Sequence, residues 1–343
     1  MNEKINIKKA SWLKRRKRLL LGLGTIVLMF LMFLFVDITS LFFKIATIGL
    51  LGLIFFVILY TIAFIIRAFR LKLIFKGLNQ NITYSTCYFS LGVSFVINDL
   101  TLGKLGDLAK IGFIKDQTEV KLSESVCGVA IERVSDLIIL FCISCFALIY
   151  LYINNLRGDV DKIILGQSIQ FYLLIGALMI VAILFILILL IYKTMFIIKI
   201  VGRISTKLAD ILGKFFINFK KGMKQFKDHK IEFVFTILLG FIIWIIEAFI
   251  VVIFFYILGY ELNILILILA MILSIFSRTF QITPGGWGIS ENIGALFVFL
   301  FYPEIPFTEI LSVFIIDHLF RSIYLFVFGG YSVFRYNVKM KEI

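Results

Sequence analysis

Long apolar runs separated by short polar segments dominate this chain of 343 residues. A helix needs about 20 apolar residues to cross a bilayer, and several runs reach that length. They predict transmembrane helices at residues 19–36, 42–66, 123–153, 170–192, 231–258, 263–281 and 308–334. The two-residue alternation of a membrane β-barrel is not seen. The pattern therefore predicts an all-α polytopic membrane protein with about seven to eight transmembrane helices.

Residues 84–110 form a further apolar segment, which is short and interrupted by Gly92. Basic residues flank it on both sides, with Lys76 before it and Lys115 after it. Because basic residues collect on the cytoplasmic side of a membrane, both flanks belong on that side. The segment is therefore predicted to be re-entrant, dipping into the membrane and returning.

Residues 284–302 form a second interrupted segment, which begins with Pro284 and contains three glycines within its first five residues. If the segment crosses the membrane, the basic tail after residue 334 lies in the cytoplasm; if it re-enters, the tail lies outside. The preference of basic residues for the cytoplasm favours a crossing that starts with a broken helix.

Residues 194–230 make up the longest polar piece of the chain. Apolar residues recur in it at helical spacing, and lysines fill the other faces. This pattern predicts an amphipathic helix lying on the cytoplasmic membrane surface.

Composition and charge agree with a membrane protein. Hydrophobic residues make up 61% of the chain, which is too many for a soluble domain of this size. The net charge of +14 comes mainly from segments between the apolar runs, which indicates membrane topology and contact with anionic lipid rather than nucleic-acid binding. The basic cluster at residues 14–18 precedes the run 19–36, which predicts a retained first helix, a cytoplasmic N-terminus and a multi-pass protein of the cell membrane.

No cofactor or metal site is predicted. Cys142 and Cys145 form a C-x-x-C pair inside an apolar run, with no second pair or histidine nearby, so helix packing explains them better. The sequence also contains no phosphate-binding loop of the ATPase type.

Two stretches, residues 103–110 and 283–291, contain glycines followed by an acidic residue and are flanked by apolar sequence. Irregular backbone and charge are costly in hydrocarbon unless they line a cavity that is buried in protein and partly wet. These stretches are therefore the main candidates for a functional site. Their candidate residues are Lys104, Asp107, Lys110, Pro284, Gly285, Gly286, Gly288 and Glu291.

The second stretch predicts the start of a helix, capped by Thr283 or Ser290. Free N–H groups at such a start suit a phosphate or carboxylate ligand. The alternative is that Glu291 itself serves as the acid of the first turn.

The predicted helix 123–153 carries Glu132, Arg133 and Asp136 in its first half. Glu132 and Asp136 are four residues apart and share a helix face, so a base must neutralise them or one acid must stay protonated. Arg133, Lys104 and Lys110 are the candidate bases. Two roles are open for these charges. They can form a structural ion network between the re-entrant segment 84–110 and this helix, or they can bind substrate or protons. The two roles are compatible.

The last predicted helix carries Asp317, His318 and Arg321. Asp317 and Arg321 have the spacing and order of an internal ion pair, but Arg321 is also a candidate to face an anionic group in a cavity. His318 fits a packed polar residue better than a proton shuttle. Glu247 is an acid in the middle of the run 231–258, and it can pair with Arg278 or Arg321.

Five motifs, in order along the chain, resemble the flippase-like transmembrane family typified by the membrane domain of lysylphosphatidylglycerol synthase. The Glu-Arg-x-x-Asp and Pro-Gly-Gly-x-Gly-x-x-Glu motifs are the most specific. The motifs comprise Arg67 and Arg70; Asp107 and Lys110; Glu132, Arg133 and Asp136; Pro284, Gly285, Gly286, Gly288 and Glu291; and Arg321.

The resemblance implies lipid binding or translocation at these residues. In the stretch that corresponds to residues 103–110, members of the family usually have a proline, a Glu and an Arg. This chain has no proline there, and it carries Asp107 and Lys110 in place of the Glu and the Arg. The sign of charge is kept, but the bidentate guanidinium is lost. In the synthases a soluble domain after the membrane part transfers the aminoacyl group; the chain ends at Ile343, so that chemistry is not expected here.

The expected function is a flippase-like protein, not an enzyme, that binds and translocates an anionic phospholipid or a polyprenyl-phosphate-linked lipid. One alternative is a membrane enzyme that modifies a polyprenyl-linked glycan or lipid. Another is an accessory subunit for a separately encoded lipid-modifying enzyme. The expected partners are membrane lipids, with a homo-oligomer or such an enzyme as further possibilities.

Overall fold

The computed structural model describes residues 38–101, 104–153, 229–278 and 283–336, together with two short strands and single positions between residues 198 and 228. The predicted helices 19–36 and 170–192 lie outside the described residues, as does most of the amphipathic segment 194–230.

The described part of the chain is almost wholly helical, which confirms the all-α class. A 3-10 turn, η1 (Pro284–Gly286), and a two-residue hairpin of β1 (Ile163–Ile164) with β2 (Gln167–Ser168) are the exceptions among the described residues. The α-helices are α2 (Ile38–Gly77), α3 (Tyr84–Leu100), α4 (Leu105–Gln117), α5 (Leu122–Ile153), α10 (Lys230–Ile257), α11 (Ile264–Ser277), α12 (Ser290–Phe301) and α13 (Phe307–Arg335).

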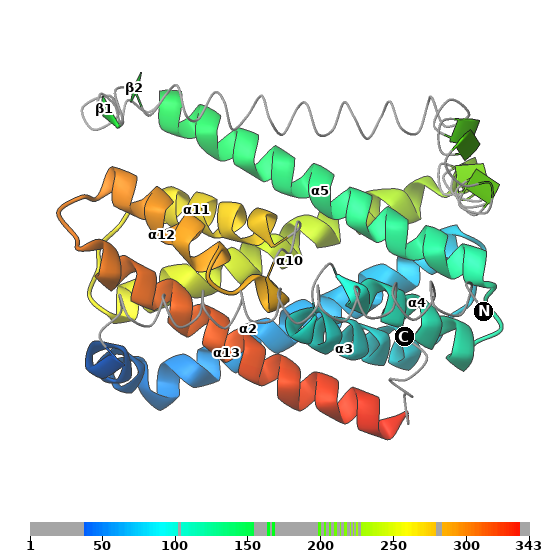
Figure 1. Cartoon of the computed structure of the whole chain (residues 1–343), viewed down its shortest axis with the longest axis horizontal. Coiled ribbons are helices and arrows are strands. Elements are labelled where there is room, and N and C mark those ends of the chain that lie inside the picture. The colour runs from blue at the N-terminus through cyan, green and yellow to red at the C-terminus, as the bar shows by residue number, and fades with distance from the viewer. Residues whose placement is uncertain are drawn as a thin grey trace, which may run out of the picture.

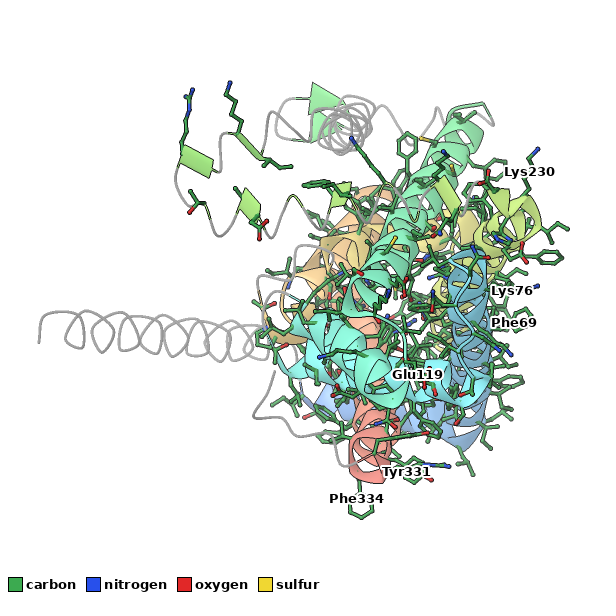
Figure 2. All side chains as sticks on the ribbon, turned by 90° about the vertical axis from the view of Figure 1, so that its right-hand side faces the viewer. Phe69, Lys76, Glu119, Lys230, Tyr331 and Phe334 are labelled. Atoms are coloured by element: carbon green, nitrogen blue, oxygen red, sulfur yellow. The ribbon has the colours of Figure 1, made fainter. Side chains whose placement is uncertain are left out.

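The helices α2, α10 and α13 form the centre of the bundle. They are the described helices that are long and apolar enough to cross a membrane. Aromatic rings fill the space between them: the Phe56 ring lies 6.3 Å from that of Phe254 and 5.7 Å from that of Phe320, measured between centroids. Figure 2 shows Phe69 and Phe334 pointing away from the helices, as expected of side chains that face lipid rather than a core.

The helix α2 extends further than the predicted range 42–66. It continues to Gly77, because Leu71, Ile74 and Phe75 give its last turns a fully buried apolar face. At its other end, the left-handed backbone of Gly49 kinks the helix. Arg67 and Arg70, expected near the end of the helix, therefore lie within it.

The piece of α2 before the kink is fastened to the start of α13. The buried Lys44 donates to the Ser312 hydroxyl at 2.6 Å and pairs with Glu309. Tyr260, in the turn after α10, also donates to Glu309, at 3.0 Å. Burial, and then this hydrogen bond, raise the pKa of the Tyr260 hydroxyl to about 12, so that it stays a neutral donor.

Two helical hairpins lie at opposite ends of the long axis (Figure 1). The first hairpin is α3 with α4, and it lies at the end of the bundle where α2 finishes and α10 begins. The second hairpin is α11, η1 and α12, and it lies at the end where α10 finishes and α13 begins. We name the first of these ends the basic end, because its exposed residues include Lys76, Lys115, Lys121 and Lys230.

The arms of the second hairpin are shorter than the predicted helices 263–281 and 284–302. These arms, α11 and α12, have 14 and 12 residues, and they pack against each other. At a rise of 1.5 Å per residue, each arm is about 20 Å long or shorter, less than the hydrocarbon core of about 30 Å. The backbone N–H of Asn263 donates to the Tyr302 hydroxyl, which joins the two arms at their base.

Candidate functional site

A cavity of about 160 Å³ lies where the tips of the two hairpins meet. It is lined from α2, α3, α5, α10, α11 and α13, and from both tips, so residues distant in the sequence converge on it. The polar lining residues are Tyr60, Arg67, Asn98, Asp99, Lys104, Arg133, Asp136, Trp244, Glu247, Arg278, His318 and Arg321.

The tip of the first hairpin is a tight turn. Gly106 passes so close to α3 that a Cβ atom there would lie 1.9 Å from the Ser94 carbonyl oxygen. The Gly106 N–H donates to the Asn98 side chain at 2.8 Å. Just before it, Lys104 holds a left-handed backbone with φ of 55°, a conformation that costs a non-glycine residue energy. This turn places Lys104 in the wall of the cavity.

The tip of the second hairpin touches the first. Gly285 has a φ of 63°, and a Cβ atom there would lie 2.7 Å from an Asp99 carboxylate oxygen at the end of α3. Gly286, also with positive φ, passes equally close to the Arg278 side chain. Glycine is needed at both positions, because an added methyl group would separate the tips or displace the arginine.

The start of α12 is not capped as expected. The N-cap position is Ile289, the Ser290 hydroxyl is buried without a partner among the described residues, and Thr283 donates to the Trp287 carbonyl instead. Glu291 accepts from the Gly288 N–H at 2.9 Å, so the acid of the first turn does the capping.

An ion network joins the first hairpin to α5 and α2. Arg133 makes a two-point contact with Asp107, at 2.8 and 2.6 Å, and Lys110 donates to Glu132 at 2.9 Å. Arg70 donates to Asp136 at 2.6 Å. The structural network that the sequence left open is therefore present, and it neutralises Glu132 and Asp136.

A second ion network links α10 with α2 and α13. Glu247 accepts hydrogen bonds from Arg67 and, at 3.1 Å, from Arg321. Arg321 also pairs with Asp317 at 2.7 Å, as their spacing predicted. Of the two partners expected for Glu247, Arg321 is therefore bonded to it and Arg278 is not. Trp244 donates to Asp136 at 3.2 Å, which connects this network to the first.

His318 lies between the two tips. Its Nδ1 atom bonds to Glu291 of the second hairpin, and its Nε2 atom lies 3.9 Å from Asp99 of the first. Its ring stacks on Trp287 at 4.0 Å between centroids, with 7° between the planes. The side chain is 2% exposed. A packed polar residue was expected here, and the structure adds an acid on each side of it.

Two cations of the cavity have no hydrogen bond or ion pair within the described residues. They are Lys104 at the tip of the first hairpin and Arg278 at the end of α11. The Arg278 Nε atom is fully buried and unbonded in the described structure. Every other cation in the lining is neutralised by an acid.

The candidate residues from the sequence divide into two groups. Those that line the cavity are Arg67, Lys104, Arg133, Asp136, Gly285 and Arg321. Those that surround it as ion-pair partners or turn residues are Arg70, Asp107, Lys110, Glu132, Pro284, Gly286, Gly288 and Glu291.

Several lining residues were not candidates. They are Tyr60, Asn98, Asp99, Trp244, Glu247, Arg278 and His318. Their position in the sequence would have indicated three of them. Asn98 and Asp99 lie shortly before the first glycine stretch, and Arg278 lies shortly before the second. No group of three or more metal-binding side chains occurs within the described residues.

Comparison with known proteins identifies the family. The profile of the lysylphosphatidylglycerol synthase transmembrane region matches residues 18–329. The chain belongs to this family, which is a family of membrane proteins linked to lipid handling. A similar curated protein is the UPF0104 membrane protein MJ1078 of Methanocaldococcus jannaschii, 31% identical over 234 residues that cover 68% of this chain and 91% of that protein. No solved structure matches significantly.

The matched range begins before α2 and ends within α13, so it takes in both hairpins and the cavity between them. The resemblance inferred from five short motifs is thereby confirmed for nearly the whole chain.

Proposed function

We propose that this protein binds the phosphate-bearing head group of a membrane lipid in the cavity and moves it between the two leaflets. The observation that carries the proposal is the pair of unneutralised cations, Lys104 and Arg278, which face one cavity from opposite hairpins. Both side chains are partly buried. A charge withdrawn from water without a partner is costly, and an anionic ligand reduces that cost.

The size and position of the cavity support a head group as the ligand. A volume of about 160 Å³ holds a small polar group but not acyl chains, which would stay in the bilayer. The hairpins reach the cavity from opposite ends of the bundle, in the manner of transporters whose broken helices meet near the membrane midplane. Displacing one tip or the other would open the cavity to one side at a time.

The distribution of charge supports an orientation in the cell membrane. Basic residues favour the cytoplasmic side, so the basic end is proposed to face the cytoplasm. The tail after Arg335 then also lies in the cytoplasm, because α13 finishes at that end. With one crossing by residues 19–36 before α2, the N-terminus is cytoplasmic as well.

The test is a head-group protection assay in proteoliposomes that contain either labelled phosphatidylglycerol or a labelled polyprenyl phosphate. The test variant is Lys104→Gln with Arg278→Gln. The matched control is Lys115→Gln with Lys121→Gln, which removes the same charge from two exposed lysines at the basic end. A charged hydrogen bond contributes about 1.5–3 kcal/mol, so losing both should weaken lipid binding about 100-fold or more.

The native protein and the control should translocate at least one of the two lipids, and the cavity variant should not. Equal rates in the native protein and the cavity variant would contradict the proposal. Chemical conversion of the polyprenyl lipid, without translocation of either lipid, would instead favour the alternative of a membrane enzyme.

A further inference from the structure

Asp99 differs from the other two acids that line the cavity. Asp136 and Glu247 each accept a hydrogen bond from an arginine. Asp99 accepts none from the residues that the structure describes, and its one ion-pair contact among them, to Nε2 of His318, measures 3.9 Å. That distance is longer than a hydrogen bond. The Asp99 carboxylate therefore has unused acceptor capacity whatever the charge of the histidine ring.

The Asp99 side chain is also well buried. It is 6% exposed, and it lies in the wall of the cavity at the end of α3. A carboxylate withdrawn from water without a hydrogen-bond donor is costly. A donor on a ligand in the cavity would reduce that cost, so this carboxylate is suited to hold part of a ligand.

The turn of the second hairpin places this acceptor beside a cation that the proposed phosphate site uses. A Cβ atom on Gly285 would lie 2.7 Å from an Asp99 carboxylate oxygen, and one on Gly286 would lie 2.9 Å from the Arg278 side chain. Two consecutive residues of one turn thus touch the two groups. Since consecutive Cα atoms are about 3.8 Å apart, both groups are within reach of one small head group.

A phosphodiester alone cannot satisfy both groups. Its oxygens suit Arg278 and Lys104, but it has no O–H or N–H group, and it carries the same sign of charge as Asp99. A phosphate oxygen next to this carboxylate would therefore be repelled. A complex that satisfies the carboxylate needs a donor on the head group, beyond the phosphate.

We propose that Asp99 accepts a hydrogen bond from the lipid head group, so that the cavity selects head groups with a hydroxyl or ammonium donor beyond the phosphodiester. This inference rests on the proposed function and deepens it, because it names the class of head group and the residue that selects it. The two cations hold the phosphate, and Asp99 distinguishes one phosphodiester from another.

The experiment compares pairs of lipids that carry the same charge, by calorimetric titration of the purified full chain. Dihexanoyl phosphatidylglycerol has hydroxyl donors, and dihexanoyl phosphatidylmethanol has none. Dihexanoyl phosphatidylethanolamine has an ammonium donor, and dihexanoyl phosphatidylcholine has none. We expect the native protein to prefer the donor-bearing lipid of at least one pair by about 10- to 100-fold, the effect of one hydrogen bond to a charged acceptor. The pair that shows the preference identifies the donor as a hydroxyl or an ammonium group.

Two variants assign the preference to Asp99. In Asp99→Ala the ratio of the two affinities should fall to about one, even if both affinities rise because a negative charge has left the cavity. Asp99→Asn keeps one acceptor oxygen without the charge, so it should retain a preference of a few-fold. A purely structural role of Asp99 would change the affinities of both lipids together and leave their ratio unchanged.

The matched control is Asp116→Ala, which removes the same charge from an exposed position of α4. It should show the native ratio in both pairs. The native protein tests the preference by itself, so the experiment is informative even if a variant of Asp99 does not fold.

Binding of the lipids without a preference in either pair would overturn this inference and leave the proposed function standing. A preference that persists in Asp99→Ala would do the same. Failure of all four lipids to bind would overturn both.

Discussion

The two hairpins meet at one cavity but are held in place by different forces. The first is fastened by charge: Asp107 and Lys110 of α4 both bond to α5. The second is held mainly by apolar packing, since α11 contains no charged residue and α12 packs Gly294 against the Phe314 ring of α13. Its one ion pair among the described residues joins Glu291 to His318.

This difference indicates which hairpin can move. Displacing the first would break the buried Lys110–Glu132 pair and the partly buried Arg133–Asp107 pair, and a buried charge left without its partner costs several kcal/mol. Displacing the second breaks one ion pair among the described residues, that of Glu291 with His318, and otherwise separates mainly apolar surfaces. We therefore expect the first hairpin to be the harder of the two to displace and the second to move more readily.

The strongest test of a fixed first hairpin is Lys110→Met. Lys110 is fully buried, and its removal leaves Glu132 with only Arg70, whose nearest guanidinium nitrogen lies at 3.7 Å. We expect the free energy of unfolding to fall by about 3–5 kcal/mol, as is typical when one partner of a buried pair is removed. Unfolding by SDS titration in mixed micelles measures it. Lys115→Met, on the same helix but exposed, should change it by less than about 0.5 kcal/mol.

The next largest effect is expected at the turn of the first hairpin. In Gly106→Ala the added methyl group would collide with backbone, the Ser94 carbonyl, which cannot rotate away. We expect a loss of about 3 kcal/mol in the same unfolding assay. The control is Gly112→Ala in the same helix, where a methyl group meets nothing within 4 Å. Similar stabilities for the two variants would show that the arms of the first hairpin are not fixed against each other.

A smaller loss of stability, but a larger loss of binding, is expected for Gly285→Ala. Left-handed backbone costs alanine about 1–2 kcal/mol, and the methyl group would also press on Asp99 and part the tips. Gly259→Ala isolates the backbone cost, because Gly259 has a φ of 83° and nothing within 4 Å. Gly285→Ala should lose at least as much stability as Gly259→Ala, and only Gly285→Ala should weaken binding of phosphatidylglycerol. Equal binding in both would show that contact between the tips is not needed.

Some features of the two hairpins and of the ion pairs around them can be predicted from the sequence alone. The free-energy cost of placing charge and irregular backbone in hydrocarbon identified both glycine–acid stretches. This cost depends only on the type of residue and on its neighbours in the sequence. The i, i+4 spacing identified the Asp317–Arg321 pair for the same reason. These predictions required no knowledge of which helices are neighbours.

Predictions that depended on neighbouring helices were less complete. Glu247 bonds to both Arg67 and Arg321, and only the packing of α10 between α2 and α13 decides this. Asp99 became a lining residue because Gly285, far along the chain, reaches it. The helices α11 and α12 have 14 and 12 residues and are shorter than the predicted ranges, because hydropathy alone does not show where the turn between them begins.

The smallest predicted effect concerns the start of α12 and distinguishes the sequence prediction from the structure. Ser290 was a candidate cap, and removing a true capping hydroxyl costs about 1 kcal/mol. In the structure this hydroxyl is buried and unbonded among the described residues, so Ser290→Ala should leave the free energy of unfolding within about 0.5 kcal/mol of native, or raise it slightly. Thr283→Ala removes a bonded hydroxyl from the same turn and should cost about 1 kcal/mol. A larger loss for Ser290→Ala than for Thr283→Ala would mean that the second tip is capped as the sequence first indicated, with Glu291 released from its bond to Gly288.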